Sequence, residues 1–238
     1  MAKSRDITSR PDGAKPVASS RAEIDAFLAK AGKVAPAAQA KGRLIFALDA
    51  TMSRQPTWDI ACQLQAEMFD TAAAIGGLAV QLVYFRGLGE SRASPFVASA
   101  RALRDLMVKI DCRGGNTQIR KVLAHVRREA EKRPVAALAY IGDAMEENPD
   151  ALCQLAGEIG LLGVRAFMFH EGRDPAAERT FREIARLTGG AYLPFNSASA
   201  AELRALLAAV ATYAVGGLKA LEKSSAAGAL LLLPQLKR

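Results

Sequence analysis

Three oxygen-bearing side chains alternate where an apolar run near the start of the chain ends. Asp49 closes the run LIFALD (44–49), and Thr51 and Ser53 follow it in the form D-x-[ST]-x-S. On an extended turn, alternate side chains point to one side, so these oxygens can converge. Hard cations such as Mg²⁺ prefer a near-octahedral set of such oxygens and retain some waters. The motif is compatible with a cation site, but taken alone it is more often an N-cap of the following helix.

Two further elements carry oxygens at the ends of expected strands or helices. Thr117 closes the segment RGGNT (113–117) just before an expected helix, and Asp143 follows Gly142 at the end of the apolar run VAALAYIG (135–142). The glycine segment alone also fits a helix N-terminus capped by Asn or Thr, or a phosphate-binding loop that lacks the P-loop lysine. A carboxylate at a strand end is about as often a cap as a ligand. The order of the three elements, all on one rim, favours a metal site.

These motifs resemble the metal-ion-dependent adhesion site (MIDAS) of the von Willebrand factor A (vWA) family. That site combines a D-x-S-x-S loop, a Thr in a Gly-rich loop and an Asp after the next core strand. The resemblance covers residues 43 to 218 and suggests an intracellular, bacterial-type member with an intact MIDAS. One departure is Thr51 in place of the more common Ser, which keeps the hydroxyl and adds a methyl group that restricts χ1.

The resemblance implies a metal site with a defined division of roles. Thr51, Ser53 and Thr117 would supply hydroxyls to Mg²⁺ or Mn²⁺, and Asp49 and Asp143 would act directly or through bound water. The remaining coordination position would stay open for a Glu or Asp of a partner protein. Intracellular members often work beside ATPases, so a subunit role in an ATPase-linked complex, with an AAA-type ATPase as partner, is a further expectation.

Alternation of short apolar runs with helical segments predicts the elements that position these residues. We expect an α/β fold with a doubly wound, mostly parallel, Rossmann-like sheet of about six strands flanked by helices. The resemblance implies the strand order 3-2-1-4-5-6, which places the first and fourth strands side by side at the switch point, where open sheets bind ligands. The expected strands are 44–49, 78–85, 135–142, 164–169 and 191–195, and the expected helices are 57–75, 98–110, 117–131, 149–160, 175–188 and 199–216.

Length and charge give the domain organisation. The 238 residues are 50% hydrophobic, which suits one core, and the net charge is +8. Residues 1–42 carry +4 and residues 219–238 carry +3, which leaves +1 for residues 43–218. We expect a basic, largely disordered N-terminal tail with one short amphipathic helix at 21–31, a vWA domain at 43–218, and an apolar and basic C-terminal tail. That last tail is either a final helix or strand packed on the domain or an exposed segment for a partner.

Several classes of protein are disfavoured by composition. The three cysteines are widely spaced, without a CxxC pair, and only two histidines are present, which indicates reduced thiols rather than a zinc site. No signal-peptide core and no run of about 18 apolar residues is found, so we expect a cytoplasmic protein without a membrane span. No basic stripe interleaved with aromatics marks the middle of the chain as a nucleic-acid reader.

The leading interpretation is therefore a metal-dependent protein-interaction module and not an enzyme. A Mg²⁺-dependent phosphohydrolase is one alternative, but such enzymes need a second Asp where Thr51 stands. A nucleic-acid-associated protein that uses its basic tails is the other. Trp58 and Glu146 lie near the expected rim, where packing or a solvated loop suits them at least as well as partner contact. His125 is interpreted as a surface residue, and His170 as most often structural.

Overall fold

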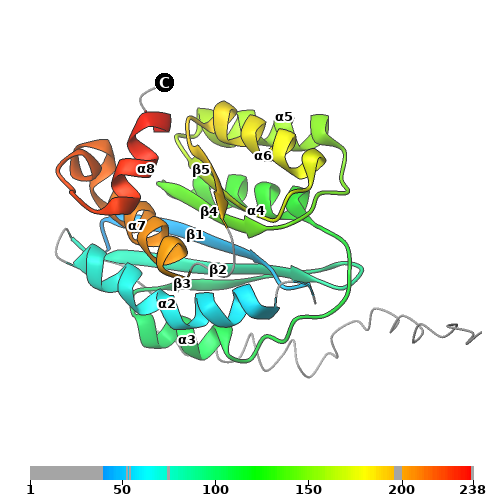
Figure 1. Ribbon diagram of the computed structural model, residues 1–238, viewed down its shortest axis with the longest axis horizontal. Helices are drawn as coiled ribbons and strands as arrows, with labels where there is room; N and C mark the ends of the chain where they lie inside the picture. Colours follow the sequence, from blue (N-terminus) through cyan, green and yellow to red (C-terminus); the bar gives the residue numbers. More distant parts are fainter. Residues whose placement is uncertain (1–39, 52, 54, 74–75, 196–199, 237–238) are drawn as a thin grey trace, which may run out of the picture.

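A six-stranded sheet forms the centre of the protein (Figure 1). The computed structural model describes residues 40–51, 53, 55–73, 76–195 and 200–236. The strand order is β3-β2-β1-β4-β5-β6, with β3 antiparallel to β2 and the other pairs parallel. The predicted α/β class and the mostly parallel sheet are thus confirmed. The strands are β1 (Gly42–Asp49), β2 (Leu78–Arg86), β3 (Glu90–Val97), β4 (Ala137–Gly142), β5 (Arg165–Glu171) and β6 (Ala191–Phe195).

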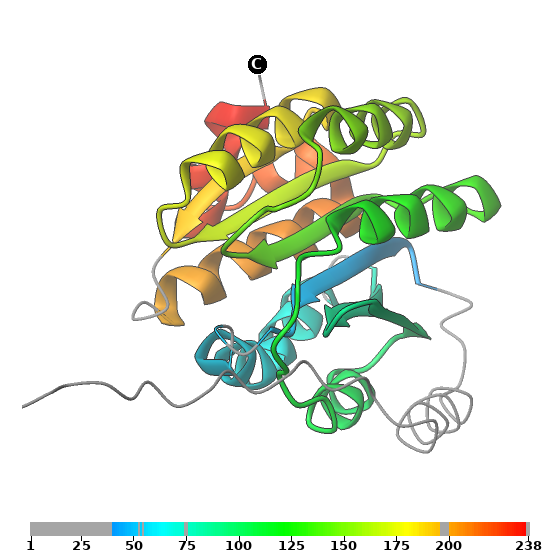
Figure 2. The same cartoon turned by 90° about the vertical axis from the view of Figure 1, so that its right-hand side faces the viewer.

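Helices cover both faces of the sheet (Figure 2). One face packs against α2 (Gln55–Ala73), α3 (Ala100–Met107), α7 (Ala200–Glu222) and α8 (Ala227–Leu236). The other packs against α4 (Ile119–Lys132), α5 (Pro149–Leu161) and α6 (Pro175–Thr188). Alternate residues of β1 enter the two cores, with Leu44 and Phe46 on the first face and Ile45 on the second. Apolar side chains on both faces are what a strand covered on either side requires.

The antiparallel edge strand β3 was not among the expected strands. Its sequence, ESRASPFV, is largely polar, and most of its residues are only half-buried. The pairing of β2 with β3 is irregular between Gln81 and Val83, where the Ser94 hydroxyl accepts a hydrogen bond from the Leu82 backbone N–H at 3.0 Å. A polar strand with a proline suits an edge, because one side of it makes no ladder. Several helix boundaries also differ by a few residues: for example, α3 ends at Met107 rather than 110, and α4 begins at Ile119 rather than 117.

The C-terminal segment forms a helix that packs on the domain. This is the first of the two possibilities that the sequence left open, the other being an exposed segment for a partner. In α8, Ala229, Leu232 and Leu236 are buried against the core formed with α7. Helix α7 is long and apolar enough to cross a membrane by length and composition, but its apolar face packs against α2 and the sheet. These features are those of a core helix. The helix predicted at 21–31 lies outside the described residues.

Candidate metal centre

The five predicted site residues line one pocket at the carboxyl edge of the sheet. Strands β1 and β4 are neighbours, with Leu48 opposite Ile141, so the loops that follow them start side by side. The pocket has a volume of about 210 Å³ and is lined by Asp49, Thr51, Ser53, Thr117 and Asp143, together with Gly114, Gly115, Ala144 and Glu146. Three loops that are distant in the sequence thus meet at the predicted switch point.

The first loop is folded around Asp49. This carboxylate is buried, and its Oδ1 accepts a hydrogen bond of 2.7 Å from the Thr51 backbone N–H. The Ser53 hydroxyl donates to Asp143 Oδ2 at 3.0 Å and lies 3.2 Å from the Thr51 hydroxyl. Because a serine hydroxyl has one hydrogen, and Ser53 gives it to Asp143, Thr51 is the donor in the second contact. Thr51 and Ser53 therefore present lone pairs, not hydrogens, to the pocket.

The glycine-rich second loop is fixed by its own backbone amides. Arg113 N–H donates to the Ala50 carbonyl at 2.9 Å, and Asn116 N–H donates to the Gly87 carbonyl at 3.3 Å. The Thr117 N–H donates to Glu146 Oε2 at 2.9 Å. An anion-binding loop needs free N–H groups directed at the ligand. These three amides are bonded to the chain's own oxygens, so they are not available to a phosphate in the pocket.

Glu146 is the site residue whose role the sequence did not reveal. Its Oε2 accepts hydrogen bonds from both the backbone N–H and the hydroxyl of Thr117, at 2.9 and 3.0 Å, and its own N–H donates to that hydroxyl at 3.2 Å. From the sequence, packing or a solvated loop suits Glu146 at least as well as contact with a partner. A signal was present, since Glu146 stands three residues after Asp143 in the same loop, but only the folded chain shows its contact with Thr117.

Residues of β5 support the loop that contains Asp143. His170 is fully buried on β5, and its Nε2 lies 3.3 Å from the backbone carbonyl of Asp143. Because a carbonyl only accepts, Nε2 carries the hydrogen, and in the neutral ring Nδ1 accepts from the Tyr192 hydroxyl at 2.8 Å. Nearby, the Thr57 hydroxyl in the first turn of α2 donates to the Glu171 carboxylate at the end of β5. His170 thus has the structural role that the sequence favoured.

His125 differs from its interpretation as a surface residue. It is half-buried on α4, and its Nε2 lies 2.9 Å from the side-chain oxygen of Gln81 on β2. Burial lowers the pKa of His125 below its usual value.

The electrostatic environment of the pocket is negative. Burial raises the pKa of Tyr140 well above its usual value, and the charges of Asp49, Glu147, Asp143 and Glu146 raise it further, so this hydroxyl stays protonated. In the described part of the chain, no three His, Cys, Asp or Glu side chains form a metal-binding group by themselves. A cation here would depend on the hydroxyl oxygens as well as the carboxylates. Hydroxyl lone pairs beside carboxylates are the donors that Mg²⁺ and Mn²⁺ prefer, so the residues present fit such a cation.

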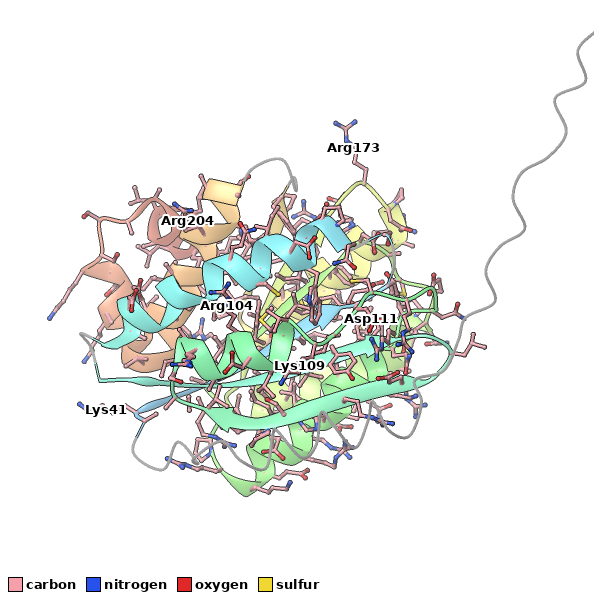
Figure 3. All side chains as sticks on the ribbon, turned by 90° about the horizontal axis from the view of Figure 1, so that it is seen from below. Lys41, Arg104, Lys109, Asp111, Arg173 and Arg204 are labelled. Atoms are coloured by element: carbon pink, nitrogen blue, oxygen red, sulfur yellow. The ribbon has the colours of Figure 1, made fainter. Side chains whose placement is uncertain are left out.

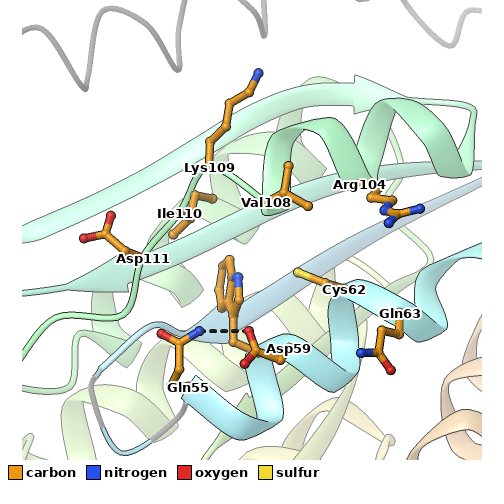
Figure 4. Close-up of a pocket in the computed structure, with 10 residues that line it drawn as sticks. Gln55, Asp59, Cys62, Gln63, Arg104, Val108, Lys109, Ile110 and Asp111 are labelled. Carbon is orange, nitrogen blue, oxygen red and sulfur yellow. Dashed lines mark hydrogen bonds between the residues drawn. The ribbon is translucent and has the colours of Figure 1, made fainter.

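A larger hollow lies beside this pocket, between α2 and α3 (Figure 4). It has a volume of about 570 Å³ and is lined by Trp58, Cys62, Arg104 and Lys109 among others. Arg104 and Lys109 are labelled in Figure 3, which views the molecule from below. Trp58, placed near the rim by sequence, is buried, and its indole N–H donates to the Met107 carbonyl at 3.3 Å. Trp58 therefore packs between the two helices, in agreement with the packing role considered for it from the sequence.

The two carboxylates that line this hollow, Asp59 and Asp111, already accept hydrogen bonds from neighbouring side chains. Asp59 accepts a hydrogen bond of 2.8 Å from the Gln55 side chain. Asp111 pairs with Arg86 and Arg113, each at 2.8 Å. Burial raises the pKa of Asp111, but the hydrogen bonds from these two arginines outweigh it, and the net pKa is lowered. The hollow therefore offers a cation no comparable set of oxygens.

Comparison with solved structures identifies the fold. A von Willebrand factor type A protein from Catenulispora acidiphila is 18% identical, with a TM-score of 0.55 over 73% of this chain and 43% of that one. The vWF domain of the type V pili tip protein Mfa5 from Porphyromonas gingivalis is 10% identical, with a TM-score of 0.58 over 74% of this chain and 95% of that one. The fold is thus that of vWA domains.

A third similar structure is described with a metal. Proximal thread matrix protein 1 from the mussel byssus, "with zinc occupied MIDAS motif", is 19% identical, with a TM-score of 0.57 over 74% of this chain and 48% of that one. The chain therefore spans less than half of the Catenulispora and mussel proteins. No protein-family model and no curated protein sequence matches the chain.

Proposed function

We propose that this chain is a metal-dependent protein-interaction module. In this proposal Asp49, Thr51, Ser53, Thr117 and Asp143 hold Mg²⁺ or Mn²⁺, and a Glu or Asp of a partner protein completes the coordination shell. The observation that carries the proposal is the direction of the hydroxyl hydrogens. Thr51 donates to Ser53, Ser53 donates to Asp143, and Thr117 donates to Glu146. All three hydroxyls therefore offer lone pairs, which a cation requires and an anion cannot use.

The donor set favours a hard cation. Every predicted ligand is an oxygen, and neither cysteine nor histidine lines the pocket. Mg²⁺ and Mn²⁺ suit carboxylate, hydroxyl and water ligands, whereas zinc sites usually include His or Cys. The zinc in the similar mussel protein supports a metal at this position of the fold, and we propose Mg²⁺ or Mn²⁺ here on the chemistry of the ligands.

The bound cation would supply a positively charged open position for a carboxylate. The chain's own residues provide the rest of the recognition. Asp49 is held by the Thr51 N–H, and Asp143 is held through Ser53 and through its carbonyl contact with His170, so both carboxylates are oriented before a cation arrives. Such preorganisation reduces the cost of ordering on binding. We propose that the module serves in the cytoplasm in an ATPase-linked complex, with an AAA-type ATPase as a partner, and that it performs no catalysis.

Calorimetric titration of Mg²⁺ and Mn²⁺ into the chelator-treated protein tests the proposal. We expect saturable one-to-one binding that is weakened at least tenfold by Asp49→Asn and by Asp143→Asn, because each loses a charged oxygen ligand. Asp150→Asn is the matched control, since this exposed carboxylate in the first turn of α5 loses the same charge outside the pocket. Intact binding in both site variants, with all proteins folded by circular dichroism, would exclude this centre.

A further inference from the structure

We infer that Glu146 is a positioning residue of this centre and acts on the cation through Thr117. The inference rests on the proposed function and extends it to a residue outside the set of five. Glu146 lines the same pocket and belongs to the loop that follows Asp143. Its contacts with Thr117 join the second and third loops of the site.

Three hydrogen bonds join the two residues. Glu146 Oε2 accepts from the Thr117 backbone N–H at 2.9 Å and from the Thr117 hydroxyl at 3.0 Å. The Glu146 backbone N–H donates to the same hydroxyl oxygen at 3.2 Å. Thr117 is 7% exposed, so these bonds satisfy a nearly buried hydroxyl and N–H, while Glu146 itself lies at the surface. Hydrogen bonds to an ionised acceptor are roughly twice as strong as neutral ones, which makes this pairing a firm constraint on the hydroxyl.

These bonds fix the direction of the Thr117 hydroxyl, because a hydroxyl can make only a limited number of hydrogen bonds. A threonine hydroxyl has one hydrogen and two lone pairs. Glu146 takes the hydrogen with its carboxylate and one lone pair with its N–H. The remaining lone pair is the one that Thr117 can offer to a cation in the pocket it lines. Without the Glu146 carboxylate, the hydroxyl loses this acceptor. Its hydrogen could then turn to the neighbouring Glu147 carboxylate, which also interacts with the Thr117 side chain, or into the pocket, and either rotation changes the direction of the lone pair offered to the cation.

Replacing Glu146 with glutamine distinguishes the effect of orienting the Thr117 hydroxyl from the effect of the negative charge of Glu146. The side-chain oxygen of Gln can accept both hydrogen bonds from Thr117, whereas Ala can accept neither. We therefore expect Glu146→Gln to keep Mn²⁺ affinity within about threefold of the wild type. Outer-layer partners of metal ligands typically contribute a factor of 10 to 100 in affinity, so we expect Glu146→Ala to lose about tenfold or more.

A double-mutant cycle tests whether Glu146 acts through Thr117. Mn²⁺ is titrated by calorimetry into the wild type, Glu146→Ala, Thr117→Val and the double variant, with thermal unfolding of each metal-free protein as a check on the fold. Thr117→Val removes the hydroxyl and keeps the shape. If Glu146 acts only by orienting that hydroxyl, the double variant binds Mn²⁺ as weakly as Thr117→Val alone, within about threefold.

Each other outcome has a distinct meaning. Losses that multiply in the double variant would overturn the inference, because Glu146 would then act independently of Thr117. Wild-type affinity in Glu146→Ala would overturn it as well. Asp49→Asn is run beside the cycle: if it abolishes Mn²⁺ binding while the cycle is additive, only the role of Glu146 fails. If the wild type does not bind Mn²⁺, the proposed function and this inference fail together.

Discussion

Replacing Gly115 with alanine should displace the loop that carries Thr117. A Cβ at this position would lie 2.2 Å from the carbonyl oxygen and 2.4 Å from the nitrogen of Gly87, in the turn between β2 and β3. Carbon–oxygen contacts normally begin at about 3.3 Å, so the two backbones must separate by about 1 Å. The hydrogen bond from Asn116 N–H to the Gly87 carbonyl would be stretched or lost by the same movement.

A shift of that size is large for a metal site. Binding geometries tolerate about 0.5 Å, and Thr117 lies only two residues from the clash. We expect Mn²⁺ affinity in calorimetry to fall about 10- to 100-fold, and the free energy of unfolding to fall by about 1–3 kcal/mol from the lost hydrogen bond and strain.

Gly114→Ala provides the matched control for this prediction. A Cβ on Gly114 meets no atom within 4 Å, although this glycine lines the same pocket. Neither glycine has a positive φ, so alanine is acceptable to the backbone at both positions. Gly114→Ala should therefore bind Mn²⁺ nearly as the wild type does. Equal affinities for Gly115→Ala and the wild type, or equal losses in both variants, would refute the argument from the close approach of the two backbones.

Two further predictions concern stability. Leu232→Ala in α8 should lower the free energy of unfolding, measured in urea, by about 2–5 kcal/mol because the Leu232 side chain is fully buried. Leu230 is 63% exposed, so Leu230→Ala should change this free energy by less than about 0.5 kcal/mol. Equal effects of the two substitutions would show that α8 does not pack on the domain in solution. Burial lowers the pKa of His125, so below about pH 6.5 the unfolded chain takes up a proton before the folded one does, and stability should fall as the pH falls. His125→Gln should flatten this slope between pH 7 and 5 in urea titrations, and an unchanged slope would contradict the assignment.

The buried strands could be predicted because their signal is local. The apolar runs at 44–49 and 78–85 lie within β1 and β2, and all residues of both strands are buried. Parallel strands covered on both faces need continuous apolar runs, which a single sequence displays directly. The placement of Asp49 and Asp143 followed from the same signal, because each stands where such a run ends.

The features that were missed depend on neighbours distant in the sequence. Strand β3 is polar because it lies at the edge, so its pairing with β2 leaves no apolar pattern to detect. The expected helix end at 216 agrees with the break in α7 at the non-helical residue Gly217, but the helical turns that follow it as far as Glu222 were not expected. Glu146 resembles a solvated loop residue until Thr117 is placed beside it. For β3 and for Glu146 the decisive contact joins segments that are distant in the sequence.

The ambiguity of the glycine-rich segment shows what kind of information decides the function. On sequence alone, RGGNT is compatible both with a phosphate loop that lacks the P-loop lysine and with a cation loop, since both need close turns and a hydroxyl. The difference lies in where the hydrogens point. The carbonyls of Ala50 and Gly87 and the carboxylate of Glu146 take hydrogens of this loop from three separate parts of the chain. Because the N–H groups of Arg113, Asn116 and Thr117 donate to these acceptors, as does the Thr117 hydroxyl, those hydrogens are not available to an anion in the pocket, and we infer that the segment suits a cation better.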